Sequence, residues 1–155
     1  MTKGKDREHF ESYREQTQIK HDILAAYLPA YYHILKGSNE NLVYIDGFAG
    51  PGSYVQTSTG NIFAGSPTLA LELIADNKDF SSKVSMIFIE ADDVLFDALN
   101  TWVDEFCRKH PHVRKPICRH GTFAEQLNEI LSGIRDNLAP TFLFVDPCGV
   151  KGTSH

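Results

Sequence analysis

Short apolar runs without charge alternate along the chain with longer segments in which apolar residues recur every three or four positions. Runs of the first kind suit strands buried on both faces of a parallel sheet, and spacing of the second kind predicts amphipathic helices. The resulting alternation of strands and helices is typical of an α/β protein. Four strands are predicted, at 42–45, 83–89, 117–119 and 141–145.

Helices are predicted between these strands, at 66–77, 94–109 and 124–137. The first of them has a good N-cap in Ser66 and a first-turn proline in Pro67. By contrast, the preceding segment 53–65 reads as a polar loop without helical periodicity.

Ahead of the first strand, the apolar spacing from residue 17 to residue 35 predicts a further helix, which Pro29 kinks or splits. The charged segment before it is expected to fray before it joins the helix. Within the helix we expect Tyr27 in the core and Lys20 facing solvent. The alternative is that Lys20, His21 and Tyr27 reach a ligand.

The clearest chemical signal follows the first strand, where Asp46 is succeeded by Gly47, Gly50 and Gly52. Glycine allows positive φ and has no Cβ, so a ligand can lie against bare backbone. An acidic residue at the carboxyl end of a buried strand, beside such a turn, is where open α/β sheets bind nucleotide-like ligands. The alternative is an ordinary strand followed by a glycine-rich loop.

The kind of nucleotide can be narrowed by the residues around this turn. No predicted helix begins directly after the glycines, which weakens NAD or FAD, since both place a pyrophosphate on a helix N-terminus. The chain also has no Gly-Lys-Ser/Thr, so it has no P-loop. S-adenosylmethionine suits the pattern better, because it has no phosphate and its positive ammonium group would be attracted to Asp46.

The segment Asp46-Gly-Phe-Ala-Gly-Pro-Gly52 resembles the first motif of class I S-adenosylmethionine-dependent methyltransferases. Together with Lys20-His21, Tyr27, Gly65-Ser-Pro67 and Asp146-Pro-Cys-Gly149, it resembles more narrowly the three-Cys-motif partner (TcmP) family of bacterial proteins. The resemblance implies a methyltransferase-like domain that uses S-adenosylmethionine. It also implies a partner protein that carries a three-cysteine motif.

The expected cofactor site lies at the carboxyl ends of the strands. Glu90 closes the second strand and is placed to accept hydrogen bonds from ribose hydroxyls. Thr122 stands where methyltransferases often have an acidic residue that contacts the adenine amino group, and Glu125 follows a little further on. The methionine part would be held by the first motif, at Asp46, Gly47, Phe48, Gly50 and Gly52.

The expected catalytic site follows the fourth strand, at Asp146, Pro147 and Cys148. Methyltransferases that act on amino groups carry Asp/Asn-Pro-Pro-aromatic here, and Asp146 would position the acceptor. Cys148 replaces the second proline, and no aromatic follows it. The alternatives for Cys148 are a structural cysteine, which is favoured, and a nucleophile such as the Pro-Cys of cytosine-C5 methyltransferases.

The predicted fold is a Rossmann-like class I methyltransferase fold truncated after the fourth parallel strand, with strand order 3-2-1-4. Residues 1–40 are expected to form an N-terminal tail and helical cap, and residues 41–155 a partial domain that binds S-adenosylmethionine. A class I sheet has seven strands and the fourth strand here is an apolar edge, so the chain is expected to be either a fragment of a longer protein or a short form that self-associates through this edge.

Composition sets bounds on partners. The chain has 155 residues, a net charge of −5 and three cysteines, an odd number that fits a reducing cytoplasm. It has no apolar run long enough to cross a membrane.

No metal is expected, because the spacing of Cys107, His110, His112 and Cys118 matches no common zinc site. A basic cluster at 108–119 is expected at the opposite edge of the sheet from the site, where its cations complement a helix C-terminus.

Two functions follow from this reading. The first is methyl transfer from S-adenosylmethionine, either acting on nucleic acid or working with a partner protein. The second is a catalytically inactive partner-binding domain that kept the methyltransferase fold. The absent aromatic after Pro147 and the absent acidic residue at position 122 favour the second.

Overall fold

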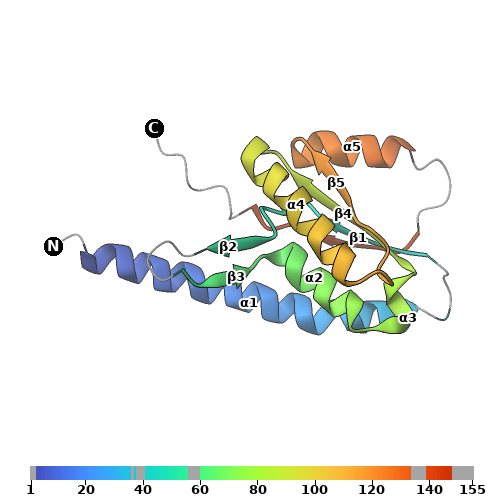
Figure 1. The fold of residues 1–155 in the computed structure, drawn as a ribbon, viewed down its shortest axis with the longest axis horizontal. Coiled ribbons are helices and arrows are strands. Elements are labelled where there is room, and N and C mark those ends of the chain that lie inside the picture. The colour runs from blue at the N-terminus through green and yellow to red at the C-terminus, as the bar shows by residue number, and fades with distance from the viewer. Residues whose placement is uncertain (1–2, 36, 38–40, 56–59, 134–138, 148–155) are drawn as a thin grey trace.

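A four-stranded parallel sheet forms the centre of the computed structural model (Figure 1). The structure describes residues 3–35, 37, 41–55, 60–133 and 139–147, with side chains from Gln18 onward. In spatial order the strands are β5, β4, β1 and β6, which confirms the predicted order 3-2-1-4. Their bounds are Ile117–His120, Val84–Glu90, Leu42–Asp46 and Thr141–Phe144.

Helices cover the two faces of the sheet unequally. On one face lie α1 (Lys3–Leu35), α2 (Ser66–Ala75), the short α3 (Lys78–Ser81) and α4 (Asp93–Lys109), whereas α5 (Phe123–Gly133) lies on the other face (Figure 1). The buried core is on the first face, where strand residues pack against residues of α1, α2 and α4. Its largest members include Leu24, Leu28, Tyr44, Leu71, Met86, Phe88 and Leu99. In contrast, α5 has no buried residue.

The first helix is continuous for 33 residues with Pro29 inside it. Of the two predicted effects of Pro29, a kink or a split, the split into two segments is therefore wrong. Proline removes one N–H group from the helix, and packing can offset this loss. Leu24, Leu28 and Tyr32 are fully buried on both sides of Pro29 and hold the helix against the sheet. The expectation that Tyr27 is a core residue is also wrong, since its side chain is 65% exposed. None of the described helices is long and apolar enough to cross a membrane.

The segment predicted as a polar loop contains an antiparallel hairpin. Its strands are β2 (Ser53–Val55) and β3 (Ile62–Ala64), with Tyr54 opposite Phe63. Aromatic and β-branched residues favour strands, and cross-strand pairs of this kind stabilise a hairpin. The prediction missed the hairpin because each strand is only three residues long.

Candidate functional site

Three neighbouring strands each carry a carboxylate at their carboxyl end. Asp46 ends β1, Glu90 ends β4, and Asp146 follows two residues after β6. Asp46 is fully buried. Burial raises the pKa of Asp46 to about 7, and the negative charges of Asp146 and Glu90 add to this rise. Three acidic side chains therefore lie at the carboxyl end of the sheet, where a nearby cation would favour the ionised form of Asp46.

Asp46 holds the loop that follows β1. Its Oδ1 accepts a hydrogen bond from the Phe48 N–H at 3.2 Å, and its Oδ2 accepts one from the Ser66 hydroxyl at 2.5 Å. These two bonds act against the rise in its pKa. Ser66 was predicted to be the N-cap of α2, but Gly65 occupies that position and Ser66 is the first helical residue. The Ser66 side chain thus ties the start of α2 to the end of β1.

The glycine turn has the backbone conformation that the sequence predicts. Gly50 and Gly52 have φ values of 66° and 83°, which side chains with a Cβ rarely adopt. A Cβ on Gly52 would lie 3.0 Å from the Trp102 ring, and a Cβ on Gly47 would lie 2.7 Å from the Phe123 ring. The turn is therefore packed between α4 and α5, which leaves no room for side chains at these positions.

Glu90 supports this turn from the neighbouring strand. Its carboxylate accepts hydrogen bonds from the N–H groups of Gly50 at 2.7 Å and of Ala91 and Asp92 at 2.9 Å. A carboxylate offers about four acceptor positions, so about one remains for another donor. The sequence did not predict this bracing role, because Gly50 is 40 residues away along the chain.

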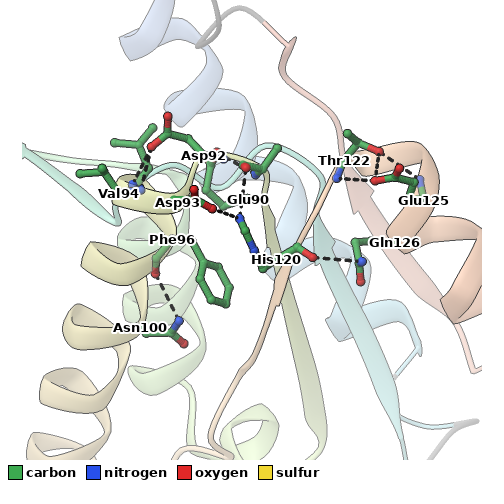
Figure 2. A network of polar contacts seen from close by, with 12 residues as sticks. Glu90, Asp92, Asp93, Val94, Phe96, Asn100, His120, Thr122, Glu125 and Gln126 are labelled. Carbon is green, nitrogen blue, oxygen red and sulfur yellow. Dashed lines mark hydrogen bonds and ion pairs between the residues drawn. The ribbon is translucent and has the colours of Figure 1, made fainter.

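His120 is the last residue of β5, and Thr122 follows two residues later (Figure 2). The Thr122 hydroxyl donates to Glu125 Oε2 at 2.7 Å and accepts from the Glu125 N–H at 3.3 Å. The hydroxyl bond, together with a bond from the Thr122 N–H to the same carboxylate oxygen at 3.2 Å, lowers the pKa of Glu125. Thr122-Phe-Ala-Glu125 is thus a capping box for α5, a signal that is present in the sequence and was missed.

His120 was not predicted as a site residue. Its Nε2 lies 3.0 Å from Asp93 Oδ1 and 3.2 Å from the Ala91 carbonyl oxygen (Figure 2). Its ring is 4.8 Å from the Phe96 ring, centroid to centroid. It joins the end of β5 to the first turn of α4, and its position as the last residue of a strand was the only available signal.

Asp146 is paired with a residue of α1. The Lys20 Nζ lies 2.6 Å from Asp146 Oδ1, and both side chains are partly buried. The expectation that Lys20 faces solvent is therefore wrong, because α1 carries it over the end of β6. His21 lies nearby: burial lowers its pKa, while the charges of Asp22 and Asp146 act in the opposite direction. Pro147 is exposed, and Cys148 lies outside the described residues.

The residues considered as zinc ligands are Cys107, His110, His112 and Cys118. His110 Nδ1 lies 3.1 Å from the Phe106 carbonyl oxygen, and His112 Nε2 lies 3.1 Å from that of Ala75. Burial raises the pKa of Cys118 to about 11. In the part of the chain that the structure describes, no group of three or more His, Cys, Asp or Glu side chains is arranged to hold a metal ion.

The fold has a counterpart among solved structures. Neither a known family model nor a curated protein matches the sequence. The chain is similar to the crystal structure of protein LPL1258 from Legionella pneumophila str. Philadelphia 1, a DUF519 protein, with a TM-score of 0.59 and 19% identity. The match covers 87% of this chain and 57% of the Legionella chain. The likeness shows an α/β fold with a parallel four-stranded sheet and flanking helices, which is consistent with a Rossmann-like arrangement.

Proposed function

We propose that the chain binds S-adenosylmethionine at the carboxyl ends of β1, β4 and β6 and acts as a methyltransferase of the three-Cys-motif partner type. One observation carries the proposal: the carboxylates of Asp46, Glu90 and Asp146 lie at the carboxyl ends of three neighbouring strands, beside the glycine turn that Glu90 holds. A ligand with a positive sulfonium and ammonium group is stabilised in this field, whereas a phosphate is repelled.

The glycine turn and Asp46 would hold the methionine part of the cofactor. The positive φ of Gly50 and Gly52 shapes the turn, and the Gly50 N–H bond to Glu90 fixes its conformation. Because Asp46 is fully buried, it acts on the cofactor through its charge and through the Phe48 amide and Ser66 hydroxyl that it orients. The one free acceptor position of Glu90 suits a ribose hydroxyl.

Asp146 and Pro147 support an amino group as the methyl acceptor. The cofactor supplies an electrophilic methyl group, and the chain's part is to align the acceptor lone pair with it. In this role Asp146 accepts a hydrogen bond from the acceptor N–H, which requires Lys20 to yield part of its contact with that carboxylate. A nucleobase or a partner protein can supply such an amino group.

The same contacts also favour the second candidate, a partner-binding domain without turnover. Lys20 forms a hydrogen-bonded ion pair with Asp146, and the Thr122 hydroxyl donates a hydrogen bond to Glu125. Glu90 is largely used by backbone amides. Asp146, Thr122 and Glu90 thus each have a structural role that does not depend on catalysis.

Calorimetric titration with S-adenosylhomocysteine, which retains the ammonium group, tests the proposal. Asp46→Asn removes the buried charge, and Asp76→Asn makes the same chemical change at an exposed position at the far end of α2. We expect the wild-type chain and Asp76→Asn to bind alike and Asp46→Asn to bind about ten- to a hundredfold more weakly, because the variant loses the buried charge and the acceptor that orients the Phe48 amide and the Ser66 hydroxyl.

Absence of binding by the folded wild-type chain would refute cofactor binding at this site. Transfer of a labelled methyl group from S-adenosylmethionine to nucleic acid or protein then separates the two candidates. Binding with no transfer to any acceptor would favour the partner-binding domain.

A further inference from the structure

The positively charged side chains fall into two groups. The structure describes the side chains of eight lysine and arginine residues. Three of them, Lys20, Lys115 and Arg119, are ion-paired with carboxylates. The other five make no ion pair with any carboxylate that the structure describes, and we call them the basic patch: Lys78, Lys83, Arg108, Lys109 and Arg114.

The basic patch lies at the amino ends of β4 and β5, the opposite end of the sheet from the candidate site. Lys83 directly precedes β4, and Lys78 begins α3. Arg114, in the loop before β5, joins these elements. Its N–H donates to the Ser81 carbonyl at 3.0 Å, and its guanidinium donates to the Ser85 hydroxyl at 2.7 Å. These three cations therefore lie around the turn from α3 into β4.

The end of α4 continues the patch. Arg108 and Lys109 form the last turn of α4, and the loop to β5 follows directly. A hydrogen bond of 3.0 Å from the Val113 N–H to the His110 carbonyl turns this loop back and keeps Arg114 close to the end of the helix. In Figure 1 this end of α4 and α3 lie at the same end of the molecule. All five cations thus share that end.

The location confirms that the cations lie opposite the candidate site, but complementing a helix C-terminus uses only part of their charge. Arg108 Nε donates to the Asp104 carbonyl at 3.3 Å, which engages one of the three nitrogen atoms of its guanidinium. Three carboxylates on the same elements, those of Asp76, Asp79 and Glu105, are fewer than the five cations. This surface is therefore locally basic on a chain whose net charge is −5.

The chemistry of the patch indicates its partner. Segments 78–83 and 108–115, which the structure describes throughout, contain no exposed large hydrophobic side chain. Binding to a membrane surface requires apolar side chains that insert, and binding to a single strand of nucleic acid uses aromatic rings on which bases stack. Protein interfaces likewise have an apolar or aromatic centre. Cations alone suit the phosphates of a double helix, which Lys and Arg contact without reading the bases.

We propose that the basic patch binds the phosphate backbone of double-stranded nucleic acid. In this orientation the acidic carboxyl end of the sheet, with Asp46, Glu90 and Asp146, faces away from the phosphates that would repel it. The two ends are separated by α4, whose 17 residues span on the order of 25 Å. The duplex is thus held without covering the proposed cofactor site. The inference concerns binding alone and does not depend on the proposed function.

Fluorescence anisotropy with a labelled DNA duplex of about 20 base pairs tests the proposal at several salt concentrations. Five phosphate contacts predict that the logarithm of the affinity falls with the logarithm of the salt concentration with a slope of about −4.5. Arg108→Gln removes one contact, so we expect a slope shallower by about 0.9 and an affinity about five- to tenfold lower at about 50 mM salt. Arg119→Gln makes the same chemical change at an arginine paired with Glu129 and should bind like the wild-type chain.

The folded wild-type chain must bind the duplex at about 20 mM salt, and absence of binding would overturn the proposal. Equal weakening by Arg108→Gln and Arg119→Gln would overturn it as well, because the effect would then reflect net charge alone. So would binding of phosphatidylserine vesicles or polyglutamate in place of the duplex. Lys109→Gln, at another exposed position, should repeat the effect of Arg108→Gln, and circular dichroism verifies that each variant is folded.

Discussion

Asp46→Asn is expected to change how the stability of the chain depends on pH. Burial and two nearby carboxylates raise the pKa of Asp46 from 3.8 to about 7 in the folded state. The folded chain therefore holds a proton that the unfolded chain releases near pH 4. Stability contributed by protonated Asp46 is fully present below about pH 4 and is lost as the pH rises to about 7.

The size of this effect follows from the shift. One pKa unit corresponds to 1.36 kcal/mol, so between pH 5 and pH 8 Asp46 should lower the free energy of unfolding by about 2.5 kcal/mol. Asparagine does not titrate, and the Ser66 hydroxyl can turn to accept from its amide. Urea unfolding of both proteins at pH 5 and pH 8 measures the difference, and other titrating groups cancel in the comparison.

Asp76→Asn serves as the control, because Asp76 is exposed at the end of α2. We expect it to leave the pH dependence of the wild-type chain unchanged. If Asp46→Asn and the wild-type chain showed the same pH dependence, burial and the nearby carboxylates would not raise the pKa of Asp46. The argument for a cationic ligand would then lose its basis.

Further predictions concern buried groups. Among the described residues the buried Tyr44 hydroxyl has no hydrogen-bond partner, so Tyr44→Phe should stabilise the chain by about 1 kcal/mol in urea unfolding. Tyr32→Phe, which loses a bond to a backbone carbonyl, should destabilise it by about the same amount, and the opposite order would contradict this reasoning. Gly52→Ala meets both a positive φ and the chain's one tryptophan and should cost at least about 2 kcal/mol, whereas Gly133→Ala in the last turn of α5 has open space and should stabilise. Glu90→Gln gives up a carboxylate that accepts three backbone N–H bonds and should lower the free energy of unfolding by about 1.5–3 kcal/mol; a neutral result would remove its bracing role.

The strands β1, β4 and β6 could be predicted from the sequence because each contains an uncharged apolar run with a clear end, whereas β5 (Ile117–His120) is short and contains Arg119. The strand order followed from the resemblance to class I methyltransferases, and the positive φ of Gly50 and Gly52 from the glycine turn. These features are local or follow from general rules of chain topology. They required no knowledge of which side chains meet.

What could not be predicted are contacts between residues distant along the chain. Lys20 and Asp146 are 126 residues apart, and no local pattern indicates that α1 brings them together. Likewise, Glu90 was identified as an acidic residue at a strand end, but its hydrogen bond to Gly50 depends on how the turn folds back. The capping box at Thr122 was readable, and was missed because the position was assigned to the cofactor.

The most direct test of the central claim is an amide-resolved NMR titration of the ¹⁵N-labelled chain with S-adenosylhomocysteine. The proposal predicts that the largest shift changes fall on the amides of Gly47, Gly50 and Gly52 and on those that follow Glu90. Changes confined to other surfaces, or no changes at saturating ligand in a folded chain, would contradict a cofactor site at the carboxyl ends of β1, β4 and β6.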